Sequence, residues 1–220
     1  MEYNLDMLKK FNGIIQPSKV NLGQLINVIE AEVSQYRYFY KTDSKDFPEV
    51  IIEVTNANIP HLLGLSKKHH VGLPTYNPSI IFEGLKGDWT LENLIKGDKY
   101  WFDQNQDKIV GVLLLYQIFH IQQCKVYTTK YIGNKSLGHR YKRDNIYFVI
   151  LRLTNNKSYT VEFSSEVPSK ENNKKVFFPR SLKINDATVE NCTEINIEFI
   201  RQERIKTKKL RAKTIKWKLD

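Results

Sequence analysis

The sequence predicts an α+β fold in which N-terminal helices are followed by an antiparallel β-sheet. Before residue 124 most apolar residues recur at helical spacing, whereas after it short aromatic and β-branched runs alternate with turn-forming residues. The 220 residues are 41% hydrophobic and 12% aromatic, which is enough for a packed core. We therefore expect an N-terminal helical segment (1–35), an α+β domain (36–200) and a basic C-terminal strand or arm (201–220).

Helical spacing is clearest in NLGQLINVIEAEVSQY (21–36), where Asn21 stands at the position of a helix cap. The next two runs, YRYFY (36–40) and VIIEVT (50–55), flank the turn-forming KTDSKDFPE and predict a β-hairpin. Residues 66–80 contain glycine and prolines and predict a loop, followed by short helices around PSIIFEGL and TLENLIK.

The longest apolar run is DKIVGVLLLYQIFHIQQ (107–123), and its length favours a buried helix over a strand despite its β-branched residues. Beyond it the chain predicts a series of strands at KVYTTKYI, NIYFVILRLT, KSYTVEFSSE, KKVFFP and EINIEFIRQERI. Asn155-Asn156 suits a tight turn between two of them, because asparagine tolerates positive φ.

The charge is divided unequally along the chain. Residues 1–110 carry 12 Lys/Arg against 14 Asp/Glu, and residues 111–220 carry 22 against 10. Such a basic half favours a polyanionic partner, with RNA preferred and DNA as the alternative. No run approaches the roughly 20 apolar residues of a membrane span, and the sequence shows no signal-peptide pattern or amphipathic basic helix. We therefore expect a cytoplasmic protein that does not bind membranes.

His61 is the first candidate for chemistry. It follows Pro60 in NIPHLLGL, at the predicted start of a short helix, and an imidazole near a helix terminus can act as a general acid or base near neutral pH. The alternative is a histidine that caps or packs the helix. His69 and His70 lack the spacing of a helical zinc pair and predict a solvated basic loop with Lys67 and Lys68, while His120 is expected in the core or an interface.

Basic and aromatic residues interleave in KYIGNKSLGHRYKRDN (130–145), a composition that suits single-stranded nucleic acid or, alternatively, a solubilising loop. In KKVFFPRSLK (174–183), Arg180 could hold a phosphate and Ser181 could add a hydroxyl donor. The candidate catalytic residues are thus His61, His139, Arg180 and Ser181. The candidate nucleic-acid-binding residues are Lys67, Lys68, Lys130, Tyr131, Arg140, Tyr141, Lys142, Arg143, Lys208, Lys209 and Arg211.

Several motifs with known chemistry are absent from the sequence. It contains no phosphate-binding GxxxxGKS/T, no GxGxxG, no HExxH, no GxSxG and no CxxC pair. Carboxylates at Asp144, Glu162, Glu166 and Glu198 lie on or beside predicted strands without a distinctive metal-binding pattern. We therefore expect no metal and no cofactor, and phosphodiester chemistry that relies on protein groups alone.

The phrase NIPHLLGL (58–65), followed by a loop and IIFEGLKGDWTLENL, resembles the start of phage-associated nuclease-like domains grouped with barnase, EndoU, colicin and RelE-type ribonucleases. VFFPRS (176–181) is similar to a late element of that family, although Ile59 replaces an expected aromatic residue. The resemblance covers residues 36–184. It implies a metal-independent RNA-cleaving fold with helices before a four-stranded antiparallel sheet, and it carries over His61, Arg180 and Ser181.

The leading hypothesis is a metal-independent endoribonuclease that cleaves through the 2′-hydroxyl of RNA, in a toxin or phage-defence role and with a cognate inhibitor protein as a further expected partner. Two alternatives stay open. One is a DNA-directed enzyme, either a restriction-type endonuclease or a base-excising enzyme. The other is a non-catalytic nucleic-acid-binding protein.

Overall fold

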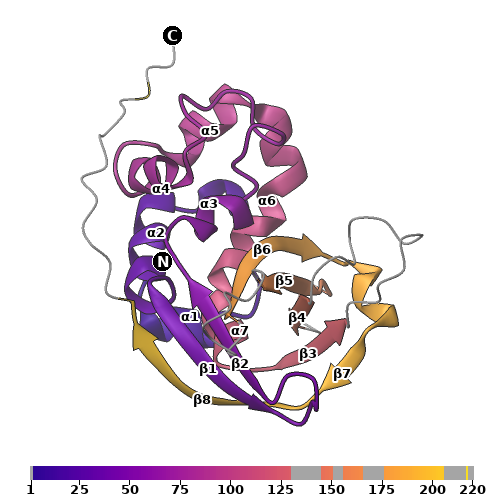
Figure 1. The fold of residues 1–220 in the computed structure, drawn as a ribbon. Coiled ribbons are helices and arrows are strands. Elements are labelled where there is room, and N and C mark those ends of the chain that lie inside the picture. Colours follow the sequence, from indigo (N-terminus) through magenta and orange to yellow (C-terminus); the bar gives the residue numbers. More distant parts are fainter. Residues whose placement is uncertain (1, 130–144, 151–155, 166–175, 206–216, 218–220) are drawn as a thin grey trace. The chain divides into compact units, whose positions relative to one another are not determined.

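The computed structural model describes residues 2–129, 145–150, 156–165, 176–205 and 217. Its contacts divide the chain into two compact units. The helical unit comprises residues 1–35, 55–116 and 206–220, and the sheet unit comprises residues 36–54 and 117–205. Figure 1 shows the helices and the sheet that give the units their names. The predicted α+β class, with helices and a mostly antiparallel sheet, is confirmed.

Most helices of the helical unit begin at a polar cap. Asn4 caps α1 (Leu5–Lys10), Asn21 caps α2 (Leu22–Glu32) and Asn77 caps α4 (Pro78–Lys86), each side chain accepting a backbone N–H of the first turn. Thr90 and Asn93 form a capping box at the start of α5 (Leu91–Gly97). The remaining elements of the unit are a 3-10 turn (Pro17–Lys19), α3 (Asn58–Leu62) and α6 (Lys99–Leu113).

The helix predicted at 107–123 is present, but it is broken and starts earlier. Asp98 accepts the backbone N–H of Trp101 and so fixes the start of α6 at Lys99, ahead of the apolar run. After Leu113 the chain turns into α7 (Leu115–Phe119), which ends before Ile121, a residue with positive φ. Polar residues in the first half of α6 hid its true start from the apolar pattern.

Within the residues that the structure describes, the sheet unit contains eight strands in the order β7-β3-β4-β5-β6-β2-β1-β8. Only the β2–β6 pair is parallel among the described pairs. The resemblance implied four strands, so this sheet is larger than expected. The strands are β1 (Tyr36–Thr42), β2 (Glu49–Val54), β3 (Cys124–Thr129), β4 (Asn145–Ile150), β5 (Tyr159–Ser165), β6 (Val176–Ile184), β7 (Thr193–Ile195) and β8 (Ile197–Arg204); a 3-10 helix (Ala187–Asn191) follows β6.

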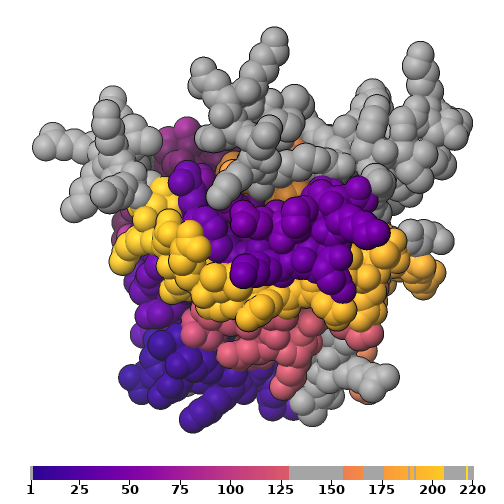
Figure 2. Space-filling model, turned by 60° about the horizontal axis from the view of Figure 1, so that its bottom comes forward, coloured from indigo at the N-terminus to yellow at the C-terminus, as the bar shows by residue number. Residues whose placement is uncertain are grey.

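The predicted hairpin of β1 and β2 is confirmed, and β8 pairs with the other side of β1. Figure 2 shows β8, in yellow, running beside the purple hairpin. β7 and β8 occupy the two opposite edges of the sheet, yet Asn196 alone separates them in sequence. The sheet must therefore roll until its edges meet, as in an eight-stranded barrel. Asp43 fastens this corner by accepting both the backbone and the side-chain N–H groups of Asn196, at 3.0 and 2.6 Å.

Aromatic side chains fill the interior of the rolled sheet. The Phe119 ring stacks on Tyr38 at a centroid distance of 4.8 Å and meets Phe163 edge-on at 5.9 Å. Tyr40 is buried, and its hydroxyl donates a hydrogen bond of 2.6 Å to the carbonyl of Phe119. His120, predicted in the core or an interface, is half-buried and contacts the rings of Tyr38 and Phe199. Polar side chains can therefore lie on the outward face of these strands.

Candidate functional site

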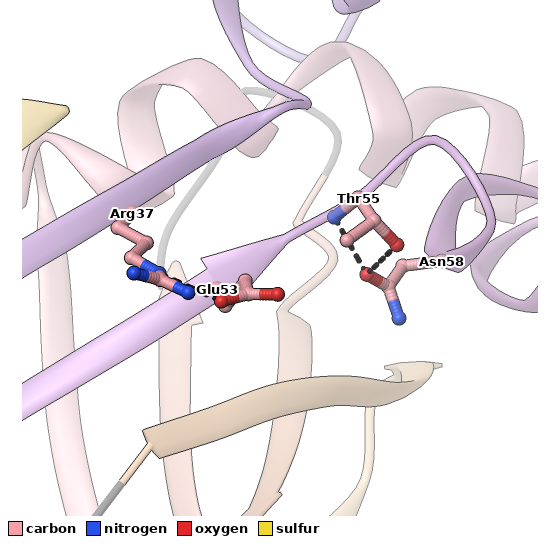
Figure 3. Close-up of polar contacts among 4 residues, drawn as sticks. All are labelled: Arg37, Glu53, Thr55 and Asn58. Carbon is pink, nitrogen blue, oxygen red and sulfur yellow. Dashed lines mark hydrogen bonds and ion pairs between the residues drawn. The ribbon is translucent and has the colours of Figure 1, made fainter. Parts of the chain in front are cut away.

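His61 lies on α3 and its side chain is exposed. The helix is entered through Asn58, whose side-chain oxygen accepts the backbone N–H of Thr55 at 2.7 Å and its hydroxyl at 2.9 Å (Figure 3). Leu62, Leu63 and Leu65 are all buried. The apolar part of NIPHLLGL is thereby explained by packing, while an exposed imidazole retains the solvent access that acid–base chemistry needs.

Gly64, the next-to-last residue of this motif, is a glycine for a steric reason. Its φ is +72°, and a Cβ placed on it would lie 2.6 Å from the side-chain oxygen of Asn105. Asn105 is itself held by a 2.9 Å hydrogen bond from its amide to the carbonyl of Trp101, and the Trp101 indole N–H donates to Leu63. Glycine at this position is thus required by the fold of the helical unit.

The double histidine behaves differently from its prediction. Lys67, Lys68 and His69 are exposed as expected, but His70 is fully buried, so its assignment to a solvated loop was wrong. Its Nε2 lies 3.0 Å from the carbonyl of Leu94, and its Nδ1 accepts the backbone N–H of Gly72 at 3.1 Å. These partners fix a neutral ring with the proton on Nε2. Burial lowers the pKa of His70, against the raising effects of the Leu94 carbonyl and Asp98.

Ser181 belongs to a polar group on β5, β6 and the turn after β6 that we call the strand-pair cluster, formed by Glu162, Ser181, Lys183 and Asp186. The Ser181 hydroxyl donates to Oε2 of Glu162 at 2.9 Å, and the Lys183 ammonium lies 3.2 Å from the same oxygen. Lys183 also lies 2.9 Å from the carboxylate of Asp186. Because Glu162 and Ser181 are paired across the two strands, their side chains leave the sheet on the same face.

Arg180 is exposed beside this cluster because of a β-bulge. Glu162 is opposite Ser181 and Phe163 is opposite Pro179, so Arg180 is the extra residue of β6 with no partner residue on β5. Bulges of this kind redirect a side chain and are common next to active sites. Arg180 is thereby an exposed residue that directly precedes Ser181 of the strand-pair cluster.

The charge states within the cluster follow from its contacts. Burial lowers the pKa of Lys183, but hydrogen bonds and charge from Asp186 and Glu162 outweigh burial, so the net pKa is raised and the group is an ammonium at neutral pH. Burial raises the pKa of the nearby Cys192 thiol against the opposing effect of Lys183, so this cysteine is not a thiolate nucleophile. The cluster offers the Glu162 carboxylate to accept a proton, and the exposed Arg180, which precedes Ser181 in sequence, adds a cation that can hold a phosphate.

One further polar atom lies on this face. Thr160 is opposite Lys183 on β5, and its hydroxyl is buried without a hydrogen-bond partner within the part of the chain that the structure describes. In the same part of the chain, no group of three or more His, Cys, Asp or Glu side chains is arranged to hold a metal ion. Among the described helices, none combines the length and apolarity needed to cross a membrane.

The structure unites only part of the predicted site. Ser181 contacts Glu162, one of the carboxylates predicted on or beside a strand. Lys183, which sequence reasoning missed, contacts the same carboxylate. Its position two residues after Ser181 on the same strand, and so on the same face of the sheet, was the signal that could have found it. His61 belongs to the helical unit, whereas Arg180 and Ser181 belong to the sheet unit. The other predicted residues lie outside the described residues: Lys130, Tyr131, His139, Arg140, Tyr141, Lys142, Arg143, Lys208, Lys209 and Arg211.

The outer face of β1, β2 and β8 is polar but balanced in charge. Arg37 pairs with Glu53 at 2.7 Å (Figure 3), and Arg201 pairs with Glu203 at 2.8 Å while its guanidinium lies 4.1 Å from the centre of the Phe39 ring. Each of these arginines therefore has a carboxylate partner. This face does not by itself present the unneutralised positive charge that a nucleic-acid backbone requires.

Comparison with known protein families finds no family model that matches the chain, and no curated protein or solved structure matches it either.

Proposed function

We propose that the chain is a metal-independent endoribonuclease acting in a toxin or phage-conflict role. The observation that carries the proposal is the strand-pair cluster, in which the Glu162 carboxylate is held by Ser181 and Lys183 beside the exposed Arg180. RNA supplies its own nucleophile, the 2′-hydroxyl, so a proton acceptor and cations are the groups that its cleavage demands.

The proposed reaction assigns a role to each group. Both Ser181 and Lys183 contact Oε2 of Glu162, so Oε1 accepts the proton of the 2′-hydroxyl as the 2′-oxygen attacks phosphorus. The exposed Arg180 stabilises the negative charge that develops on the phosphoryl oxygens, while Lys183 and Ser181 hold Oε2 of the Glu162 carboxylate. The P–O5′ bond breaks and the 5′-oxygen takes a proton from water. The products are a 2′,3′-cyclic phosphate and a free 5′-hydroxyl.

Two features of the sequence support the same proposal. The second half of the chain carries 22 Lys/Arg against 10 Asp/Glu, which favours a polyanionic substrate. NIPHLLGL and VFFPRS resemble elements of barnase, EndoU, colicin and RelE-type ribonucleases, and we propose a kinship with that group on these two motifs. An inhibitor protein that neutralises the positive charge of this half of the sequence is a natural partner for such a toxin.

The test is incubation of the purified protein with total RNA in EDTA, followed by analysis of the new termini. The wild type is expected to yield 2′,3′-cyclic phosphates, and a 2′-O-methyl group at the cleaved nucleotide is expected to block cleavage there. Glu162→Gln keeps the shape but removes the proton acceptor, so the rate is expected to fall by about 10²- to 10⁴-fold. Glu49→Gln, an exposed residue on β2, is the matched control and should leave the rate unchanged.

Other outcomes would refute the proposal or favour one of the alternative functions. Intact RNA with and without Mg²⁺, or full cleavage by Glu162→Gln, would refute it. Cleavage of duplex DNA only with Mg²⁺ would favour a restriction-type nuclease, and abasic sites in DNA would favour a base-excising enzyme. Salt-sensitive binding without any product would favour a non-catalytic nucleic-acid-binding protein.

A further inference from the structure

Trp217 docks onto the helical unit through its indole ring. The ring meets Trp89 nearly edge-on at a centroid distance of 5.1 Å and lies 6.1 Å from the ring of His70. A Cβ added to Gly97 would lie 2.9 Å from Cζ2 of Trp217, so the indole rests directly on the glycine backbone. We call the surface formed by His70, Trp89 and Gly97 the indole slot.

The ring of His70 is fixed by contacts that do not involve Trp217. Its two ring nitrogens are hydrogen-bonded to the backbone of Leu94 and Gly72, and its ring centre lies 5.3 Å from the ring centre of Trp101. A Cβ on Gly72 would lie 2.3 Å from the carbonyl oxygen of Gly97, so these two backbones are also in direct contact. One side of the slot is therefore built by the helical unit alone.

The opposite wall is equally independent of its occupant. Trp89 is 1% exposed, and its ring packs so closely on α4 that a Cβ on Gly84 would lie 2.4 Å from it. A site whose walls are held before the ligand arrives loses little conformational entropy on binding. The slot has the features of a preformed binding site for one flat aromatic side chain.

We propose that the indole slot is a separable docking site whose occupant is Trp217, and that it binds the segment KTIKWKLD (213–220) even when this segment is supplied as a free peptide. The segment carries three lysines besides its tryptophan. Docking of Trp217 thus tethers a strongly basic stretch of sequence to the helical unit. This inference does not depend on the proposed ribonuclease activity.

The indole, rather than the lysines, provides the specificity of the site. Three aromatic or backbone surfaces contact the ring, and aromatic pairs in such tilted geometry attract each other beyond the effect of buried area alone. A peptide with alanine in place of the tryptophan has the same charge but lacks this contact. The two peptides therefore separate docking from general electrostatic attraction.

The test uses the full chain carrying Trp217→Ala, in which the slot is vacated, and fluorescence anisotropy of a labelled KTIKWKLD peptide. Saturable binding is expected for this peptide, with at least tenfold weaker binding for KTIKAKLD. The wild-type chain should bind the labelled peptide far more weakly than the variant, because its own Trp217 competes at an effective concentration on the order of millimolar.

Glycine variants supply a matched control in the same Trp217→Ala background. Gly97→Ala places a methyl group where the indole rests and is expected to reduce peptide affinity at least tenfold. Gly23→Ala, on α2, has room for its methyl, with the nearest atom at 3.6 Å, and should leave affinity unchanged. Circular dichroism and thermal unfolding check that each variant is folded.

Equal binding of the two peptides, or an unchanged affinity in Gly97→Ala, would overturn the proposal. A second readout comes from the chain itself, because all three of its tryptophans lie at the indole slot: Trp89 is part of it, Trp217 occupies it and Trp101 contacts His70. Intrinsic fluorescence therefore reports on the slot alone. Trp217→Ala should shift the remaining emission to longer wavelength. The unlabelled alanine peptide should not reverse this shift, whereas an unlabelled peptide with 4-fluorotryptophan, whose ring does not fluoresce, should reverse it.

Discussion

Two glycine-to-alanine changes in the helical unit are expected to alter stability in opposite directions. Gly23 lies in α2 and Gly84 lies in α4, so each change gains helix propensity, up to about 1 kcal/mol. A methyl at Gly23 meets only ordinary contacts of 3.6–3.7 Å. We therefore expect Gly23→Ala to raise the free energy of unfolding by about 0.5–1 kcal/mol.

Gly84→Ala meets the buried Trp89 instead. The new Cβ would lie 2.4, 2.5 and 2.9 Å from three atoms of the indole ring, so the ring would have to retreat by about 1 Å to restore ordinary contact. Because Trp89 is 1% exposed, it has no solvent to move into. Overpacking of a filled core costs about 1–3 kcal/mol, and we take about 3 for so close an approach. Less the propensity gain, the net loss is about 2 kcal/mol.

Urea unfolding followed by tryptophan fluorescence and by circular dichroism measures both changes. The mechanism also predicts coupling: when Trp89→Leu removes the ring, the cost of Gly84→Ala should shrink by more than about 1 kcal/mol. A Gly84→Ala protein as stable as the wild type would refute the reasoning. So would an equal cost of Gly84→Ala in the presence and absence of the Trp89 ring.

Three further predictions follow from buried polar groups and one cap. Burial lowers the pKa of His70 below its ordinary value of 6.5, so the unfolded chain binds the proton more readily than the folded chain. The free energy of unfolding should therefore fall as the pH is lowered from about 6.5 toward the folded-state pKa. Urea unfolding at several pH values should show that His70→Gln removes this pH-dependent component. Tyr40→Phe leaves the carbonyl of Phe119 without its donor and should cost about 1–3 kcal/mol in thermal or urea unfolding, with no loss expected if that carbonyl gains another partner. Asn21→Ala removes the acceptor of the Gln24 N–H and should cost about 1 kcal/mol in the same assay, whereas Asn21→Ser should retain most of the stability.

The elements that sequence predicts well are those whose signals are local. The cap at Asn21 and the alternating runs of the β1–β2 hairpin lie within the segments that they shape. The partner of β1 in β8 and the parallel pairing of β2 with β6 depend on chain segments far away, and no local pattern specifies them. The start of α6 was missed although its signal is local, because a single cap, Asp98, lies ahead of the apolar run on which the prediction rested.

The candidate site divides in the same way. Ser181 and Arg180 stood out because of their residue types, but the contact of Ser181 with Glu162 and Lys183 requires the register of β5 against β6. His70 shows the opposite error. Its neighbours in KKHH are charged and exposed, whereas its burial depends on Leu94 and on aromatic rings distant in sequence.

The corner at Asn196, where the rolled sheet closes, also sets the order in which the chain can fold. During synthesis β1 and β2 emerge early, yet β1 receives its second neighbour only when β8, the last of the described strands, has been made. Pairing across so long a loop is slow, and until it happens one side of β1 exposes unpaired backbone groups. The sheet unit must therefore complete its folding after most of the chain has left the ribosome. Nascent chains that stop before β8 would expose an open strand to chaperones or to aggregation.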